Sequence, residues 1–465
     1  MHPEAGQLLR MAADAANQGA FNQALPMLSH ALTLDFEATA PAYAELLSHL
    51  SLTGWPTQLE ADLVTCLHAR TVDPQALART TARMLLVKYP EPIVAEDALW
   101  IAFLTRCINV DPAMEARLAW LAGETLPEGL RAALAVQAFA GEYVWGGEGL
   151  GVPPEAVAAL AEEQALTEAM PSLGPSGDAV SDRVRAQYEA NPYPRWRAPA
   201  GRQRVSVAAH LAALGAPQAE PLAVLVAGCG TGFEPIDLAR MDPSLTITAL
   251  DLSGASLAYG QRMASRLGVQ AVRFVQGDIL DIAELGQRFG LVNCTGVLHH
   301  MERPEDGLAA LTGVLEPGGV VRLALYSERA RGWVAEAQRV IAEHGWDASA
   351  EGIRAFRAHV LALPPEKPLS RLRESDDFYT LSGCRDLCFH VREHWYRLPA
   401  IGEMLTAAGL ELLMLDAPPD AQGLFTRLFG TGGDRRSLAL WDQVEATAPH
   451  LFAGMFHLWA KRVAG

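Results

Sequence analysis

The sequence has few cysteines, no long apolar run and no leader-like start. Six cysteines in 465 residues are too sparse for a disulfide scaffold. No apolar run reaches the ~18 residues that a membrane span needs. The segment Met1–Glu4 lacks the basic-then-apolar layout of a signal peptide. These absences predict a cytoplasmic protein with reduced thiols and no membrane partner.

Basic residues are also scarce. Lys and Arg number 37 against 54 Asp and Glu, which gives a net charge of −17. The longest basic run is Arg435-Arg436. Because an acidic chain repels nucleic-acid phosphates, we expect no nucleic acid among the partners. The 50% of hydrophobic residues nevertheless allows a large core, and the length suits two large domains.

Residues 1–170 have the pattern of a helical repeat domain. Apolar residues recur there at helical spacing. Three similar segments end at Asp35, Asp73 and Asp111, and these aspartates are 38 residues apart both times. A proline follows the second and third, where it would end a helix pair.

The first of these units resembles a tetratricopeptide repeat. Gly19, Phe21, Ala24 and Ala31 lie near that family's small and aromatic positions. The resemblance implies a solenoid with a concave binding face. A helical domain that only stabilises the chain or forms a homodimer is the alternative.

Residues 171–200 are interpreted as a linker, and 201–465 as a second domain. From 222 to 325, β-rich runs alternate with helical stretches, which predicts a parallel sheet. The apolar run 221–227 leads into a glycine-rich turn, Gly228–Gly232, whose backbone amides a ligand can approach. Its G-x-G-x-G spacing is not the G-x-G-x-x-G of dinucleotide enzymes, which disfavours an oxidoreductase.

Polar residues follow the next three expected strands. Asp251 ends the second and can accept hydrogen bonds from both hydroxyls of a ribose. Asp278 follows the third, where its carboxylate can take an adenine amino group while Ile279 packs on the ring. The fourth leads to His299 and His300.

Five ordered motifs in this region resemble the class I S-adenosylmethionine-dependent methyltransferases. They are Gly228–Gly232, Asp251, Gly277-Asp278, Val297–His300 and Pro317–Gly319. The resemblance implies an α/β Rossmann-like domain with a seven-stranded sheet. It places the fifth strand after a turn at 315–319, the sixth at 409–415 and an antiparallel seventh at 455–461, between strands five and six. It also leaves a helical insertion at 327–395.

The resemblance further implies a binding site for S-adenosylmethionine. Residues of the strand ends would contact this cofactor: Gly228, Cys229, Gly230, Thr231, Gly232, Asp251, Leu252, Asp278, Ile279, Thr295 and Gly296. A segment before the first strand would close over it as a lid through Tyr188, Tyr193 and Arg195, with Arg195 pairing the cofactor carboxylate. The alternative is an aromatic plug that joins the two domains.

Four histidines are candidates for catalysis: His299, His300, His390 and His394. A neutral imidazole just past strand four can take the acceptor's proton at pH 7, although both histidines there could simply pack beneath the loop. The segment His390–His394 matches an H-x-x-E-H pattern, which on one helix face could ligate a metal. No further ligand is identified, so we expect no metal and place this segment at the acceptor pocket or in a polar network. Cys384 and Cys388 lack the third cysteine of a radical enzyme.

The sequence therefore predicts an enzyme that transfers a methyl group from S-adenosylmethionine to a nitrogen, oxygen or sulfur nucleophile. A repeat domain fused to such an enzyme favours a protein or peptide acceptor. A small-molecule acceptor enclosed by the insertion is the alternative. A non-catalytic cofactor-binding scaffold is a third reading.

Overall fold

The computed structural model describes residues 2–48, 57–174, 177–197, 199, 204–390 and 392–463. The chain forms two compact units, and each is assembled from three stretches. Unit 1 takes Met1–Ala158, Arg195–Arg202 and Ile341–Leu387; unit 2 takes Ala159–Pro194, Gln203–Val340 and Cys388–Gly465. Much of the expected insertion thus groups with the N-terminal helices, whereas the sequence analysis expects two contiguous domains.

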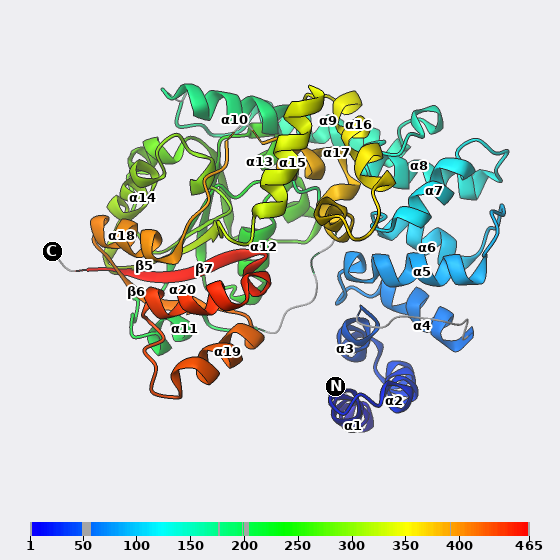
Figure 1. The fold of residues 1–465 in the computed structure, drawn as a ribbon, viewed down its shortest axis with the longest axis horizontal. Helices are drawn as coiled ribbons and strands as arrows, with labels where there is room; N and C mark the ends of the chain where they lie inside the picture. Colours follow the sequence, from blue (N-terminus) through cyan, green and yellow to red (C-terminus); the bar gives the residue numbers. More distant parts are fainter. Residues whose placement is uncertain are drawn as a thin grey trace. The chain divides into compact units, whose positions relative to one another are not determined.

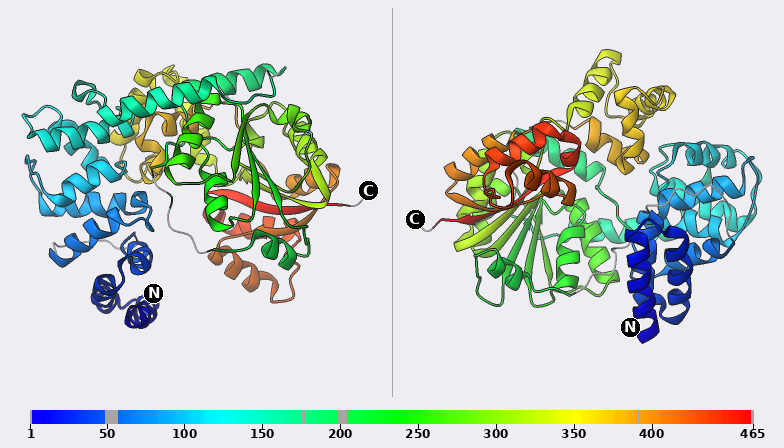
Figure 2. Two further views of the ribbon diagram at one scale, coloured as in Figure 1. Left: turned by 180° about the vertical axis from the view of Figure 1, so that it is seen from behind. Right: turned by 60° about the horizontal axis from the view of Figure 1, so that its bottom comes forward.

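Unit 1 contains helices and no strand among its described residues. Its N-terminal helices are α1 (Pro3–Asn17), α2 (Phe21–Leu34), α3 (Phe36–Ser48), α4 (Thr57–His68), η1 (Pro74–Leu77), α5 (Ala78–Lys88), α6 (Ala98–Arg106), α7 (Pro112–Leu121), α8 (Glu128–Ala140) and η2 (Glu148–Leu150). Its later helices are α16 (Ala350–Ala362), η5 (Pro368–Glu374), η6 (Asp376–Tyr379) and α17 (Leu381–Cys388), of which the last residue lies in unit 2. Figure 2 shows α1 and α2 side by side in dark blue.

The Asp-Pro pairs of the repeat mark where helices begin. Asp73 and Asp111 are N-caps, whose carboxylates accept hydrogen bonds from the first backbone amides of η1 and α7. The following proline is the first helical residue in each case, where its missing N–H costs nothing. The predicted boundaries therefore exist, but they are helix starts set by a capping aspartate rather than helix ends set by the proline.

A buried ion pair explains why residues 341–387 belong to unit 1. The Arg357 guanidinium of α16 donates to the Glu115 carboxylate of α7 at 2.6 Å, and both side chains are buried. A second guanidinium N–H of Arg357 donates to the carbonyl oxygen of Phe378 at 2.6 Å. Burial of a charge requires such pairing, so α16 and α7 fold as parts of one core.

Unit 2 contains a seven-stranded sheet with the order β3-β2-β1-β4-β5-β7-β6. Its strands are β1 (Ala223–Ala227), β2 (Thr246–Asp251), β3 (Val272–Gln276), β4 (Phe289–Thr295), β5 (Leu315–Tyr326), β6 (Leu410–Asp416) and β7 (Met455–Arg462). β7 is antiparallel to both β5 and β6, which confirms its expected place between them. The strand interiors are buried and apolar, as in a sheet covered on both faces.

Helices cover both faces of this sheet, as Figures 1 and 2 show. The helices of unit 2 are α9 (Pro154–Glu168, from residue 159 on), α10 (Ala179–Ala190), α11 (Val207–Ala213), α12 (Phe233–Met241), α13 (Gly254–Arg266), η3 (Ile279–Leu285), η4 (Leu298–His300), α14 (Pro304–Gly313), α15 (Gly332–His344, up to residue 340), α18 (Leu398–Ala407), α19 (Pro419–Phe429), α20 (Leu438–Thr447) and η7 (Pro449–Phe452). The helical insertion between β5 and β6 is therefore confirmed.

One strand departs from its expected bounds. The turn predicted at 315–319 is the first part of β5, because Leu315 pairs with Phe289 of β4. The register then shifts before Leu291 pairs with Val320, and Gly318 within the shift has a φ of +73°. A glycine in the left-handed region lets the strand bulge without ending.

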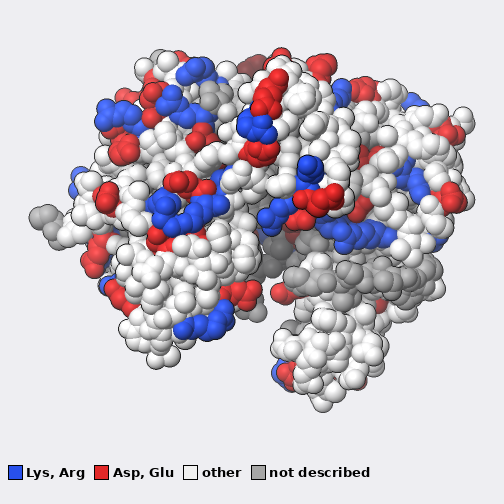
Figure 3. Space-filling view, in the orientation of Figure 1, with Lys and Arg blue, Asp and Glu red and all other residues white. Residues whose placement is uncertain are grey.

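The strand ends determine where a ligand can bind. Strands β1–β5 are parallel, so their carboxyl ends meet at one edge of the sheet. Open α/β sheets bind ligands at that edge. On the face that Figure 3 shows, the basic side chains of the described residues are interspersed with acidic ones. None of the described helices has the length and apolarity for a bilayer crossing.

Candidate functional site

The glycine-rich turn after β1 adopts a conformation that only glycine tolerates easily. Gly228, Gly230 and Gly232 have φ values of +70°, +51° and +78°. The Gly228 amide donates to the Leu250 carbonyl oxygen at 2.7 Å, which ties the turn to the end of β2. A Cβ atom on Gly232 would lie 2.9 Å from the Gly260 Cα atom of α13. The turn is therefore held by close backbone packing.

Asp251 at the end of β2 organises this turn. One carboxylate oxygen accepts from the Gly230 amide at 2.7 Å, and the other accepts from the Ser253 amide at 2.9 Å. Burial raises the pKa of Asp251 to about 6, although the two amides oppose that shift and the charge of Glu189 adds to it. Leu252, the next residue, is half-buried.

The segment that the sequence predicts as a lid lies against the same turn. Glu189, at the end of α10, accepts hydrogen bonds from the backbone amides of Gly254 and Ala255 at 2.8 and 2.9 Å. The Thr231 hydroxyl donates to the Pro194 carbonyl oxygen. The carbonyl oxygen of Tyr193 lies 3.1 Å from where a Gly230 Cβ would be. Arg195 belongs to unit 1, so its cofactor contact stays a prediction.

The residues expected near the adenine and the methionine lie at the ends of β3 and β4. Asp278 is buried and caps η3 by accepting from the Leu280 amide at 3.0 Å, and Ile279 beside it is buried. Thr295 and Gly296 are half-buried at the end of β4. The Val297 side chain packs against the glycine-rich turn, because its Cγ2 atom lies 2.3 Å from the position that a Cβ atom on Gly228 would take. The ends of β1 and β4 thus meet.

His299 is a buried histidine with unsatisfied ring nitrogens. It lies in η4 and has no exposed surface. Neither its Nδ1 nor its Nε2 has a hydrogen-bond partner among the described residues. The rings of His300 and Tyr326 have their centroids 4.2 and 4.5 Å from its own. A buried polar atom without a partner is costly, so such a ring is suited to meeting a ligand.

The other predicted histidines join this cluster. The His390 ring stacks on the His300 ring at a centroid distance of 3.5 Å. The Tyr188 hydroxyl hydrogen-bonds His390 Nε2 at 3.3 Å, so the predicted lid also reaches the cluster. The His394 amide donates to the His299 carbonyl oxygen at 2.8 Å. The structure therefore brings the rings of His299, His300 and His390 together with the Tyr188 hydroxyl. His394 joins them through its backbone, and its own ring Nε2 lies 3.1 Å from the Met301 carbonyl oxygen.

The helix face expected for the H-x-x-E-H segment is wrong. α17 ends at Cys388, and the described residues from 389 to 395 have no helical conformation. The chain there runs alongside η4, as the hydrogen bond to His299 shows, and reaches Tyr396, whose amide donates to the Tyr326 carbonyl oxygen at 2.9 Å. The pairing with this neighbouring backbone takes the place of helical hydrogen bonds.

A buried ion pair between Arg331 and Glu393 beside the cluster was not predicted from the sequence. The Arg331 guanidinium donates to both carboxylate oxygens of Glu393 at 3.1 and 3.0 Å and lies 3.5 Å from the centre of the Tyr326 ring. Both members of the pair are buried. Glu393 is part of the H-x-x-E-H pattern, but nothing in the sequence pairs it with an arginine 62 positions earlier.

The electrostatics of the cluster keep its central imidazoles neutral. Burial lowers the pKa of His299 well below its usual value, and the Arg331 charge acts in the same direction. Burial likewise lowers the pKa of His300, with smaller contributions from the neighbouring histidines. Neutral imidazoles carry a lone pair, so these two rings can accept a proton or coordinate a cation.

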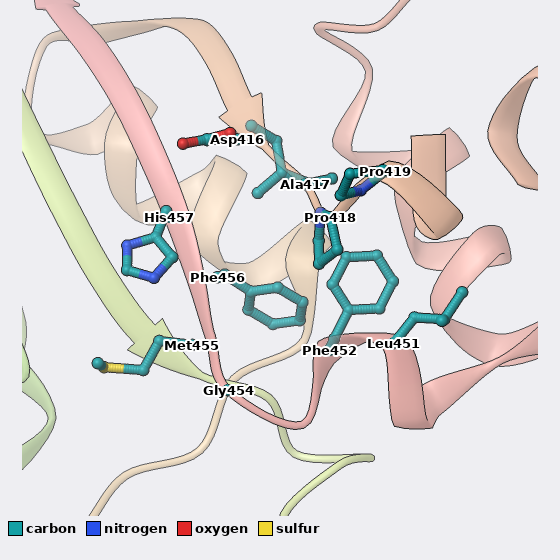
Figure 4. A pocket seen from close by; sticks show the side chains of 11 residues that line it. Asp416, Ala417, Pro418, Pro419, Leu451, Phe452, Gly454, Met455, Phe456 and His457 are labelled. Atoms are coloured by element: carbon teal, nitrogen blue, oxygen red, sulfur yellow. The ribbon is translucent and has the colours of Figure 1, made fainter. Parts of the chain in front are cut away.

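A pocket of about 360 Å³ opens elsewhere at the same edge of the sheet, beyond the end of β6 (Figure 4). Its walls are largely apolar, with Pro418, Phe452 and Phe456 among them, and Asp416 and His457 on one side. β4, β5 and β7 separate β6 from β1 in the sheet. The pocket contains none of the sequence-predicted site residues.

Comparison with known proteins finds methyltransferases. The model of a methyltransferase domain family matches residues 220–353. An uncharacterized protein of Synechococcus is 33% identical over 295 residues, which cover 57% of this chain and 68% of the relative. An uncharacterized methyltransferase of Mycobacterium tuberculosis is 27% identical over 164 residues, covering 32% of this chain and 81% of the relative.

A solved methyltransferase-like structure is among the matches. PKMT2 from Rickettsia typhi, in complex with AdoHcy, superimposes with a TM-score of 0.44 at 15% identity. The match covers 57% of this chain and 55% of that one, so the chain spans about half the length of this solved structure.

Proposed function

Because the chain belongs to the class I S-adenosylmethionine-dependent methyltransferases, we propose that it methylates a nitrogen, oxygen or sulfur atom of a protein or peptide side chain at the histidine cluster. The observation that carries this proposal is His299. Neither of its buried ring nitrogens has a hydrogen-bond partner among the described residues. The residue lies just past the end of β4, the strand next to β1 in the sheet.

We assign the cofactor to the edge formed by the ends of β1–β4. Asp251 would accept the ribose hydroxyls, and the turn Gly228–Gly232 would lie beneath the methionine. Asp278 and Ile279 would flank the adenine, and Gly296 would line the methyl end. The ionised carboxylate of Asp251 is the form that can accept hydrogen bonds from both ribose hydroxyls.

The reaction requires mainly that the protein align the acceptor with the methyl group and exclude water from the site. The acceptor atom attacks the sulfonium methyl in line and expels S-adenosylhomocysteine, so the acceptor must give up its proton. The neutral rings of His299 and His300 are the available bases, and the Tyr188–His390 hydrogen bond would close the cluster over the acceptor. Because the cluster is buried, we expect its acceptor to be a slender group such as a single side chain.

The helical unit supports the choice of a protein acceptor. Its paired helices, with capped turns at Asp73 and Asp111, suit an extended binding surface. Deleting residues 1–158 alone is a poor test, because they share the buried Arg357–Glu115 pair with residues 341–387. A deletion would leave one of these charges buried and unpaired.

The test therefore uses the whole chain with methyl-labelled S-adenosylmethionine and a cell extract divided by size into protein and low-mass fractions. We expect label in the protein fraction, and S-adenosylhomocysteine formation about 100-fold slower in His299→Gln with unchanged cofactor affinity. His457→Gln, in the same unit but outside the cluster, is the matched control. Label confined to the low-mass fraction would replace the protein acceptor with a small molecule. Formation of no S-adenosylhomocysteine with either fraction would contradict the assignment as an enzyme.

A further inference from the structure

The histidine cluster contains three side chains with the composition of a metal site. His299, His300 and Glu393 each offer one ligand atom, and these atoms all lie within 4.8 Å of one another. Two imidazoles and a carboxylate with open positions form the arrangement that binds divalent transition metals. We propose that His299, His300 and Glu393 bind one divalent transition-metal ion at the acceptor site, an inference that rests on the proposed function for its location.

His300 is oriented as metal-ligating histidines are. Its Nδ1 lies 2.8 Å from the Arg392 carbonyl oxygen, and a carbonyl can only accept, so Nδ1 carries the proton. The Nε2 lone pair is then directed away from that bond and is available to a cation. In metal-ligating histidines, the ring nitrogen that does not bind the metal usually donates its N–H to a carbonyl or carboxylate, which fixes the ring orientation.

His299 differs from His300 in that neither of its ring nitrogens is already hydrogen-bonded to a described residue. Its two ring nitrogens lack partners among the described residues, although the ring is fully buried. A metal ion would satisfy one of these atoms by taking its lone pair. The other would keep the ring proton, and the Tyr326 ring beside it, at 4.5 Å between centroids, limits how the imidazole can turn.

Glu393 is held in place while one ligand position stays open. A carboxylate has about four lone-pair positions. Arg331 uses two of them, one on each oxygen, and the Trp395 indole N–H uses a third on Oε1. The remaining position lies on Oε2. Such hydrogen bonds around a ligating carboxylate fix its orientation.

The charge of Arg331 influences which additional ligand the bound ion would take. Its positive charge compensates that of Glu393, so the three ligands contribute no net charge around a dication. The site therefore favours an anionic additional ligand, such as an ionised acceptor atom. The ion would lower the pKa of that acceptor atom. With the ion bound, His299 and His300 would both use their lone pairs as metal ligands, so neither would act as the base. Nitrogen ligands favour cobalt, nickel or zinc over magnesium.

Metal content tests this directly. The full-length protein is equilibrated with Co²⁺, Zn²⁺ or Mg²⁺, dialysed, and analysed by mass spectrometry of the metals. We expect about one Co²⁺ or Zn²⁺ per chain and no retained Mg²⁺. His299→Ala and Glu393→Gln should each lose this ion, while His457→Ala, a histidine outside the cluster, keeps it. The visible absorption of Co²⁺ would report tetrahedral nitrogen ligation in the wild type.

The outcomes separate this inference from the proposed function. No retained transition metal in the wild type, or retention that persists in both ligand variants, overturns the metal site. If methyl transfer then survives chelation and is lost in His299→Gln, the proposed function stands with imidazole as the base. A bound ion without any methyl transfer would support the metal site and contradict the enzyme. Circular dichroism of each variant distinguishes loss of the metal from misfolding. Glu393→Gln preserves the side-chain volume, so it keeps the test valid if His299→Ala does not fold.

Discussion

Glu189 and Asp251 bind three consecutive backbone amides at the start of α13. Asp251 accepts from Ser253, and Glu189 accepts from Gly254 and Ala255. The positive end of the helix stabilises both carboxylates, yet the charge of Glu189 raises the pKa of Asp251. The predicted lid, which contributes Glu189, is thereby coupled to the residue that would hold the ribose.

Binding of S-adenosylmethionine should depend on pH through Asp251. Burial raises its pKa to about 6, so the free protein holds a proton on this carboxyl below that pH. Because the ionised form accepts the ribose hydroxyls, the dissociation constant should rise about tenfold per unit as the pH falls below 6 and be constant above 7. Calorimetric titrations between pH 5 and 8 measure this. A constant affinity across that range would contradict the role of Asp251.

The substitution Glu189→Gln should move that profile. Removing the neighbouring negative charge makes Asp251 easier to ionise, so the loss of affinity should begin at a lower pH. At pH 5 the variant should therefore bind the cofactor more tightly than the wild type does. Asp182→Asn, which removes an exposed charge from the same helix, should leave the profile unchanged. Identical profiles for the two variants would refute the coupling.

The contact between the ends of β1 and β4 can be tested with a double-mutant cycle. Gly228→Ala should weaken cofactor binding about tenfold or more, because the residue has a φ of +70° and its Cβ would lie 2.3 Å from Val297 Cγ2. Val297→Ala should relieve the collision and recover part of the affinity, leaving the backbone strain. Equal losses in Gly228→Ala with and without Val297→Ala would place the strain elsewhere.

A buried ion pair holds the end of α9 in unit 2. Glu163 of α9 and Arg262 of α13 are 2.8 Å apart, and both side chains are 9% exposed. Glu163→Ala should destabilise the unfolding transition of unit 2 by about 3–5 kcal/mol, since it leaves a buried guanidinium unpaired. Urea denaturation followed by fluorescence measures this. The exposed Arg339–Glu336 pair is the control, and Glu336→Ala should cost about 1 kcal/mol or less. Equal effects would show that residues 159–168 are not part of this core.

The sheet could be predicted from the sequence because its signals are local. Each strand of β1–β4 is a short β-rich run, and carboxylates at the end of β2 and just past β3, Asp251 and Asp278, mark the carboxyl edge. The order of these motifs then identifies the family. The bulge at Gly318 was missed because a glycine pair indicates a turn equally well.

The histidine cluster could be predicted only as a set of candidates. Its members come from α10, η4 and the segment after α17, and nothing local brings Tyr188 close to His390 or Arg331 close to Glu393. The non-helical conformation of 392–395 depends on a backbone partner far away in the sequence, which the helix-like spacing of the motif cannot indicate. The grouping of 341–387 with unit 1 depends in the same way on the distant Arg357–Glu115 pair.

The measurement that tests the account most directly is a calorimetric titration of the full-length protein with S-adenosylmethionine at pH 7.5, on the wild type, Asp251→Asn and Glu284→Gln. Glu284 is an exposed residue of the same unit and serves as the control. We predict saturable binding by the wild type and Glu284→Gln, and a loss of about 30-fold or more in Asp251→Asn, which corresponds to one lost hydrogen bond to a charged group of about 2 kcal/mol. Unchanged affinity in Asp251→Asn, in a folded sample, would contradict the cofactor site described above.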